Sequence, residues 1–316
     1  MSSAQRTAVE WLMLAALVAM WGSSFMFIKL GVASVPTATL VAARLILGAA
    51  ILLTVVYLRG ARLPALTRAN ARVWGNYLIM ALLGNCIPFT SITWGQQRTD
   101  SALAGILMAV MPLTTMVLAH FFVTGEHMTR ARAAGFALGF AGIIVLMGPT
   151  AIVGFADLSK TGLSAVSQLA ILFGAVCYAA NSVLTRILAR GDDVLVASAA
   201  MLLAASLIAT PVALWLDRPW LLAPSTSSTA AIVWLGVGPT AIATVVYFKL
   251  IASAGPTFMS LVNYMSPVVA VFLGVALLGE APGAHAYVAL GLILIGIGVS
   301  QGVFALFARE AHDGRA

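Results

Sequence analysis

Ten long runs of mostly apolar residues constrain the fold of this chain more than any other feature. A helix that crosses a membrane needs about 20 consecutive apolar residues. Of the 316 residues, 61% are hydrophobic and only 9% are charged, so one water-soluble core could not hide the apolar surface. The expected spans cover residues 11–30, 36–58, 73–96, 101–124, 133–154, 165–186, 194–216, 230–250, 256–279 and 284–307. The sequence therefore predicts an all-α integral membrane protein with ten transmembrane helices.

The second half of the chain repeats residue types of the first half at equal spacings. These spacings join Trp21 to Lys29, Tyr178 to Arg186, Glu126 to Gly142 and Glu280 to Gly296. Such agreement predicts an internal repeat, with one unit over residues 1–154 and the other over residues 155–316. Each unit holds an odd number of spans, so the second unit enters the membrane from the opposite side. We therefore expect two inverted five-helix repeats around a central cavity.

Basic residues gather in every second connection between the expected spans. They are Arg6, Arg59, Arg62, Arg68, Arg72, Arg130, Arg132, Arg186, Arg190, Arg309 and Arg315. The other connections hold only Arg98, Lys160 and Arg218, with Lys29 near a helix end. The positive-inside rule then places both termini in the cytoplasm. Because the net charge of +7 follows this pattern, it predicts a lipid bilayer and not a nucleic acid as the partner.

Polar and aromatic side chains within the spans are the candidates for lining the cavity, because polar atoms at membrane depth need partners or water. They are Trp21, Ser24, Asn85, Trp94, Tyr178, Asn181, Tyr247, Asn263 and Tyr264. Trp21 with Tyr178, and Ser24 with Asn181, occupy matching repeat positions. An aromatic pocket with a few hydrogen-bonding groups suits an amphiphilic solute. Alternatively, the amides and hydroxyls join helix to helix and some rings lie in an interfacial belt.

Arg44 is the one charge plainly embedded in a span, and no Asp or Glu lies near the middle of any span. Inserting an arginine there costs at least about 2.5 kcal/mol, so a partner or water must offset it. Arg44 could contact a substrate carboxylate, or it could make a structural contact with backbone carbonyls or a helix end. His120 could have a proton-linked role or simply be hydrogen-bonded to a neighbour.

Four prolines interrupt the third and fourth spans of the two units: Pro88, Pro112, Pro239 and Pro267. Proline removes a helical hydrogen bond and frees a carbonyl, which membrane helices tolerate beside protein or water. We expect hinges near the cavity, with static bends as the alternative.

Glycines mark the ends and the packing faces of the later spans in each unit. Gly125-Glu126 and Gly279-Glu280 end the fourth spans and are interpreted as structural turns, with gates as the alternative. Gly135 with Gly139, and Gly298 with Gly302, place small residues one turn apart, which favours close helix contact within the molecule or between molecules.

The Trp21-Gly-Ser-Ser-Phe segment with Lys29, Arg44 in the next span, and the Gly-Glu turn before a glycine-rich helix resemble the drug/metabolite transporter superfamily, EamA type. The resemblance covers nearly the whole chain, because the pieces occur in family order and recur in the second half. Within the superfamily the chain is most similar to the aromatic amino-acid exporters of bacterial inner membranes. The resemblance implies a central cavity and export of aromatic or apolar amino acids, or related metabolites, by alternating access.

Two other functions compete with this interpretation. A drug or organic-cation exporter of the same superfamily is disfavoured because no acid lies at membrane depth. An integral-membrane enzyme is disfavoured because no His clusters with Asp, Glu or Ser in a catalytic or metal-binding spacing. We therefore expect no catalytic residue, no metal and no cofactor. The expected partners are a small-molecule substrate and the bilayer, for a monomer or alternatively a dimer.

Overall fold

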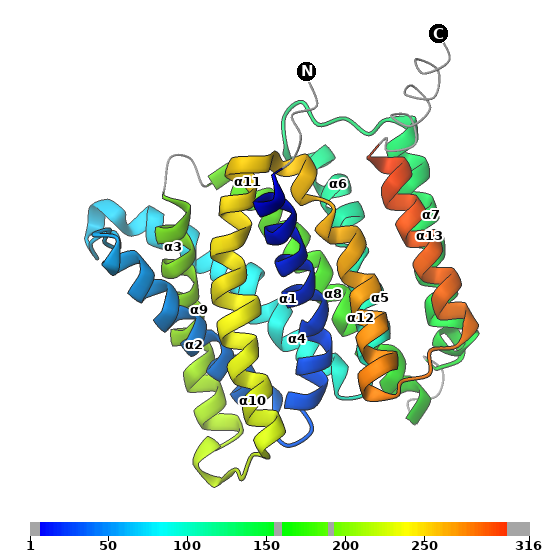
Figure 1. The fold of residues 1–316 in the computed structure, drawn as a ribbon, viewed down its shortest axis with the longest axis horizontal. Coiled ribbons are helices and arrows are strands. Elements are labelled where there is room, and N and C mark those ends of the chain that lie inside the picture. Colours follow the sequence, from blue (N-terminus) through cyan, green and yellow to red (C-terminus); the bar gives the residue numbers. More distant parts are fainter. Residues whose placement is uncertain (1–6, 155–159, 189–192, 302–316) are drawn as a thin grey trace.

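Helices make up all the regular structure in the part of the chain that the computed structural model describes, residues 7–154, 160–188 and 193–301 (Figure 1). Two are π-helical, η2 and η4. In chain order the main elements are α1 (Ala8–Gly31), α2 (Thr37–Leu58), α3 (Ala71–Ala81), η2 (Leu82–Cys86), α4 (Ile87–Gln96), α5 (Ser101–Met108), α6 (Met111–Phe122), α7 (Arg130–Gly154), α8 (Lys160–Leu188), α9 (Val194–Leu216), α10 (Thr226–Leu235), η4 (Gly236–Ile242), α11 (Ala243–Met259), α12 (Val262–Leu278) and α13 (Ala284–Ser300). The predicted all-α class is confirmed.

Within the described ranges, eight helical stretches are long and apolar enough to cross a membrane, and two shorter apolar helices, α12 and α13, have 17 residues each. The prediction for α9 agrees at both ends. The predicted start of the ninth span, residue 256, is wrong for α12, because Gly255 (φ 84°) kinks the chain and the helix after the kink ends at Met259. The predicted end of the last span, residue 307, lies outside the described residues.

Helix starts follow from side chains that accept hydrogen bonds from free backbone N–H groups. Thr7 and Glu10 form a capping box at the start of α1, with Thr7 Oγ1 accepting from the Glu10 N–H at 3.3 Å. Asp193 caps α9 and Ser225 caps α10 in the same way.

The third span of each half becomes π-helical beside its proline. Segment η2 ends just before Pro88, and η4 contains Pro239. Pro112 lies in the first turn of α6, directly after the break between α5 and α6. Pro267 lies within the continuous helix α12. Three of the four prolines therefore coincide with changes in helical geometry, and their role as hinges stays a prediction.

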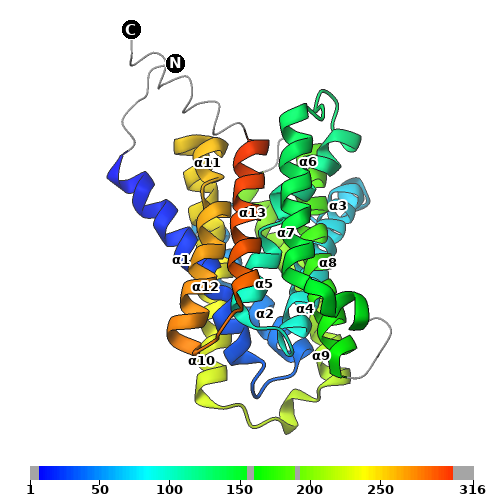
Figure 2. The same cartoon turned by 90° about the vertical axis from the view of Figure 1, so that its right-hand side faces the viewer.

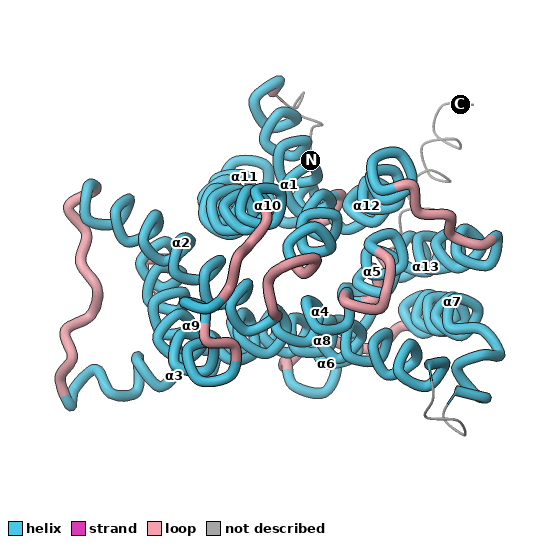
Figure 3. The backbone as a smooth tube through the Cα atoms, turned by 90° about the horizontal axis from the view of Figure 1, so that it is seen from below, coloured by secondary structure: helices cyan, strands magenta, loops and turns pink. Residues whose placement is uncertain are grey.

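Helices of the first half pack against their counterparts in the second half. Helix α2 packs against α9, α5 against α12, and α7 against α13. Helix α8 packs against α4, α5 and α6, and in the same manner α1 packs against α10, α11 and α12. In Figure 3, α7 and α13 lie at one end of the bundle, and α2, α3 and α9 at the other.

The start of α1 and the end of α13 lie at the same end of the bundle, the upper end in Figures 1 and 2. The α6–α7 connection also lies at this upper end, whereas the α4–α5 and α12–α13 connections lie at the lower end. The described chain thus begins and ends at the same end of the bundle, and which end faces the cytoplasm stays a prediction.

The contact between α7 and α13 depends on glycine. A Cβ atom built on Gly135 would clash with the carbonyl oxygen of Gly296, and one built on Gly296 would lie 2.6 Å from the carbonyl oxygen of Gly135. The close contact predicted for Gly135 is therefore found inside one molecule. Its partner is Gly296, where an added Cβ would also lie 2.8 Å from the backbone nitrogen of Gly139, while a Cβ added at Gly139 would meet Leu113 of α6. The contact predicted for Gly298 with Gly302 cannot be compared, because Gly302 lies outside the described residues.

Replacing Gly135 with Ala should force α7 and α13 apart and lower the free energy of unfolding by about 1–3 kcal/mol, as overpacking does. The matched control is Gly291→Ala on α13, where an added Cβ meets nothing within 4 Å. Thermal unfolding of the purified protein in detergent measures both. Equal melting temperatures for the two variants would contradict this account of the interface.

Candidate functional site

A hydroxyl at the middle of the eighth span connects three parts of the molecule. Pro239 has no N–H to donate to the Leu235 carbonyl, and the Thr240 hydroxyl donates to that oxygen at 2.7 Å. The same hydroxyl oxygen accepts a hydrogen bond of 2.8 Å from Arg44 Nε on α2. Thr240 therefore ties α2 to the π-helical segment η4.

Arg44 is the centre of this arrangement and is only 6% exposed. Its guanidinium carbon lies 3.8 Å from the centre of the Phe89 ring on α4, a distance at which a cation is attracted to the ring face. Phe89 in turn meets the ring of Tyr178 on α8 edge to face, with 6.3 Å between the ring centres. Helices α2, α4, α8 and η4 thus converge on one buried cation.

Trp21 of α1 also contacts η4. Its indole Nε1 donates to the carbonyl oxygen of Pro239 at 3.2 Å, and its ring centre lies 5.8 Å from that of Tyr247. Its repeat counterpart Tyr178 contacts Phe89, the residue after Pro88. Each member of this matched pair therefore touches the proline break of a third span, Trp21 in the second half and Tyr178 in the first.

We name the residues Trp21, Arg44, Phe89, Tyr178 and Thr240 the central cluster. The sequence predicted Trp21 and Tyr178 as site residues and left two interpretations open for Arg44. It missed Phe89 and Thr240. Both directly follow a proline at matching positions of the two third spans, and that repeated position is the signal that could have identified them.

Asn181 and Asn85 lie by the first-half break. A Cβ atom on Gly84 would lie 2.6 Å from Asn181 Nδ2, so the amide rests against the backbone of η2, which also contains the buried Asn85. Asn181 Oδ1 is buried without a hydrogen-bond partner among the described residues.

The other predicted site residues lie elsewhere or use their polar atoms locally. The Ser24 hydroxyl donates to the Met20 carbonyl of its own helix at 2.9 Å, a local bond that neither of the two interpretations describes. Trp94 lies near the end of α4, with the Arg98 guanidinium 5.7 Å from its ring. Asn263 and Tyr264 lie in the first turn of α12, and the Tyr264 hydroxyl is buried without a partner in the described structure.

Lys29 near the end of α1 and Glu280 just after α12 hold the α4–α5 connection at the lower end. Lys29 Nζ donates to the carbonyl oxygens of Gln96 and Thr99 at 3.1 and 3.0 Å. The Glu280 carboxylate accepts from the backbone N–H groups of Ser101 and Ala102 at 2.7 and 2.8 Å, and so caps α5. Gly279 has a left-handed conformation (φ 66°), as the interpretation as a structural turn expects, but Glu280 also links distant parts of the chain.

The matching residues at the upper end bind each other. Glu126 forms ion pairs with Arg132 at 3.0 Å and with Arg186 at 3.2 Å. Hydrogen bonds from Arg186 and Arg132 lower the pKa of Glu126, so this carboxylate stays charged at pH values where an ordinary glutamate begins to take up a proton.

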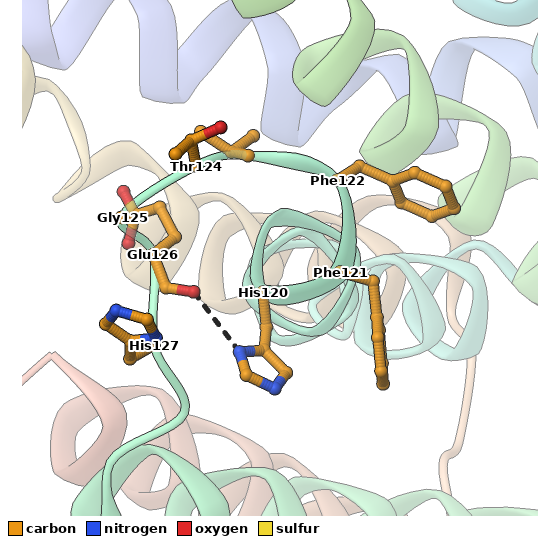
Figure 4. Close-up of a pocket in the computed structure, with 8 residues that line it drawn as sticks. His120, Phe121, Phe122, Thr124, Gly125, Glu126 and His127 are labelled. Atoms are coloured by element: carbon orange, nitrogen blue, oxygen red, sulfur yellow. Dashed lines mark hydrogen bonds between the residues drawn. The ribbon is translucent and has the colours of Figure 1, made fainter.

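His120 lies beside the same turn (Figure 4). Its Nδ1 accepts from the Met128 N–H at 3.2 Å and lies 3.2 Å from the Glu126 carbonyl oxygen. This contact agrees with the simpler interpretation of a histidine bonded to its neighbours. A cavity of about 320 Å³ is lined by residues 120–127, and none of the predicted binding residues lines it.

The helices define an integral membrane protein with many spans, and comparison with known proteins identifies its class. The model of the EamA-like transporter family matches residues 9–148 and again residues 166–300. The chain therefore belongs to the EamA-like transporter family, and the resemblance drawn from the sequence is confirmed. Family membership points to a transporter and away from an enzyme, and it implies a small-molecule substrate.

Several relatives extend this finding. The "Uncharacterized inner membrane transporter YedA" of Escherichia coli K12 is 30% identical over 289 residues, which cover 89% of this chain and 87% of that protein. The "Probable terminal-alkyne amino-acid exporter" of Streptantibioticus cattleyicolor is 27% identical over 280 residues, covering 89% of both chains. The "Aromatic amino acid exporter YddG" of Ancylobacter novellus is 30% identical over 200 residues, covering 63% and 66%. A solved crystal structure aligns with a TM-score of 0.65 at 24% identity over 93% of this chain and 98% of that one, which shows the fold.

Replacing Thr240 with Val should lower the free energy of unfolding by about 1–3 kcal/mol, because Arg44 Nε loses its acceptor while it stays buried. Thr244→Val is the matched control, since the Thr244 hydroxyl only donates to the Thr240 carbonyl of its own helix at 2.6 Å. Chemical or thermal unfolding in detergent compares the two. A loss for Thr244→Val as large as that for Thr240→Val would show that the link to Arg44 is not what matters.

Proposed function

We propose that this protein is a secondary transporter that exports aromatic or apolar amino acids, or related small metabolites, across the bacterial inner membrane by alternating access. The observation that carries the proposal is the central cluster, where aromatic side chains from both halves meet beside two proline breaks. The names of two relatives, an aromatic amino-acid exporter and a terminal-alkyne amino-acid exporter, support the substrate class.

The proposal includes two inverted units, residues 1–154 and 155–316. Support comes from the corresponding helix contacts of the two halves and from the family model, which matches once in each half. The distribution of arginines supports cytoplasmic termini, which makes the upper end of the bundle the inner end. Since the glycine faces of α7 and α13 are used within the molecule, we expect a single copy to suffice.

The character of the central cluster favours this substrate class over the runner-up. Aromatic rings at mid-membrane depth offer an apolar solute stacking surfaces. A lipophilic cation would instead meet the buried charge of Arg44, and no acid of the spans lies at that depth to attract it. An amino-acid exporter is therefore preferred to an exporter of organic cations.

Alternating access needs contacts that close the outer end and the inner end in turn. The matched acids Glu280 and Glu126 are the candidates for making these contacts. At the lower, outer end Lys29 and Glu280 reach from one group of helices, with α1 and α12, to the connection between α4 and α5 of the other group. At the inner end the counterparts Arg186 and Glu126 pair with each other inside one group. We infer that the described conformation is latched at its outer end.

Opening outward then requires Glu280 to leave the start of α5. By the pseudo-symmetry of the proposed repeats, Glu126 and Arg186 would exchange their mutual ion pair for contacts with the α11–α12 connection. The two groups of helices would rock about the central cluster, where η2 and η4 provide the breaks that let the third spans bend.

Flux through liposomes that contain the purified protein tests the proposed function. Labelled phenylalanine, tryptophan and leucine should exchange against the same internal amino acid faster than in protein-free liposomes. Counterflow is measured with and without an imposed pH difference, which also separates proton coupling from downhill movement. Absence of flux across a broad amino-acid panel would refute the proposal.

Replacing Glu280 with Gln should weaken the outer latch and favour the outward-open state. Loss of a helix cap of about 0.5–2 kcal/mol corresponds to a population shift of about 2- to 30-fold. The reporter is Thr99→Cys, at a position that is 3% exposed, in a chain whose two described cysteines, the buried Cys86 and Cys177, are replaced with Ala. A membrane-impermeant maleimide applied from outside should label it faster by that factor.

The matched control for this experiment is Glu126→Gln, because it removes the corresponding acid of the other half. It should leave external labelling of Thr99→Cys unchanged or slower. Equal acceleration by both substitutions would mean that the two acids only stabilise the fold and do not select between the two open states.

A further inference from the structure

Arg44 is a buried cation whose described surroundings offer it no anion. The ion pairs in the described ranges are Lys29 with Asp100, and Glu126 with Arg132 and with Arg186, so none includes Arg44. The acids of the whole sequence lie at span ends, in connections or in the tails. Arg44 thus holds a positive charge at membrane depth beside partners that are all neutral.

Hydrogen bonding satisfies only part of the guanidinium, which carries five N–H donors in a fork. Among the described residues an acceptor is present for Nε, the Thr240 hydroxyl oxygen at 2.8 Å. The two terminal nitrogens have no hydrogen-bond acceptor among the described residues. These two nitrogens are not fully enclosed, although Arg44 as a whole is only 6% exposed.

The open edge of the guanidinium has the geometry for one kind of ligand. Two parallel N–H donors match the two oxygens of a carboxylate, and such charge-assisted pairs are the strong ones. The Thr240 hydroxyl fixes the Nε edge and the Phe89 ring covers one face, so the fork is held in place before a ligand arrives. A carboxylate would also neutralise the embedded charge.

A purely structural role does not explain why Arg44 is charged, as its repeat counterpart in the second half shows. The contact of α2 with η4 has its counterpart in the contact of α9 with η2 and α3. There the position that matches Arg44 is Met201, which packs among apolar and aromatic side chains. Helix α9 thus packs against the third span of the first half with an apolar side chain at this repeat position, so the packing of the matching helices does not in itself require a guanidinium.

We propose that Arg44 binds the carboxylate group of the transported solute, which makes the substrate class carboxylate-bearing solutes, amino acids among them, and excludes amines and amides of the same shape. This inference rests on the proposed function and deepens it. Rings of the central cluster then contact the remainder of the solute, and Arg44 discriminates by charge.

Binding to the purified protein in detergent tests the inference without relying on transport. The probes are phenylalanine, phenylalaninamide, which lacks the carboxylate, and benzoate, which lacks the amine. Calorimetry or thermal stabilisation should show wild-type protein binding phenylalanine and benzoate at least about tenfold more tightly than the amide. In Arg44→Gln the carboxylates should bind about tenfold more weakly while affinity for the amide changes little, because only the charge-assisted pair is lost.

Two further variants keep the result interpretable. Arg44→Lys retains the charge needed at this depth but lacks the planar fork, so it should fold and show a smaller preference for carboxylates than the wild type. Met201→Gln makes the corresponding change in the other half and should leave the preference unchanged. A wild-type protein without a preference for carboxylates, or an Arg44→Lys variant with the full preference, would overturn the inference.

Flux measurements separate this failure from that of the proposed function. If phenylalanine crosses the liposome membrane but Arg44→Gln retains the wild-type ratio of phenylalanine to phenylalaninamide flux, the transporter stands and the carboxylate site is wrong. If no amino acid crosses but benzoate binds to the wild type and not to Arg44→Gln, the carboxylate site stands and the substrate is another carboxylate.

Discussion

The hydrogen bonds of the Thr240 hydroxyl are the interaction on which the centre of this molecule depends. In a bilayer, backbone carbonyls and buried charges find no water, so a protein group has to satisfy each of them. One hydroxyl serves both, since it donates to the Leu235 carbonyl beside Pro239 and accepts from Arg44 Nε. The Thr240 hydroxyl therefore links the proline break to the embedded cation, and this link depends on the close approach of α2 to η4. A side chain added at Gly48 would collide with Thr240, which shows how near the two helices lie.

The two ends of the bundle use similar residues in different ways. Lys29 and Glu280 bind the connection between α4 and α5, whereas Arg186 and Glu126 bind each other. If the halves are inverted copies, this difference is the signature of one conformation of two, because the same residues can make either set of contacts. The surface ion pair is individually weak. The helix cap that Glu280 forms is stronger. Because the Glu280 carboxylate lies at the start of α5, loss of this cap can move the whole helix.

The positive charge of Arg44 also determines how the neighbouring aromatic rings act. Phe89 lies face-on to the Arg44 guanidinium, and Tyr178 lies edge-on to Phe89. Such an arrangement orders a cation that would otherwise move, and it surrounds the cation with groups that cannot neutralise it. Selectivity among solutes then depends more on their charge than on their shape, since an apolar pocket by itself distinguishes similar solutes only weakly.

Hydrophobic run length determined the helical class and most span bounds, because the thickness of a bilayer fixes how many apolar residues a helix needs. The start of the ninth helix was mistaken, since the kink at Gly255 depends on backbone conformation and not on hydropathy. Equal spacings in the two halves of the sequence predicted Trp21 and Tyr178 as site residues, because the two occupy matching positions of the repeat. Phe89 and Thr240 became visible only in the folded chain, because Arg44 of the second span joins Phe89 of the third span to Thr240 of the eighth, far along the sequence. The sequence by itself determined which residues enter the membrane, since that follows from the apolar character of each segment. Only the tertiary structure decided which of them meet, because contacts between helices depend on where small residues and proline breaks let the backbones approach.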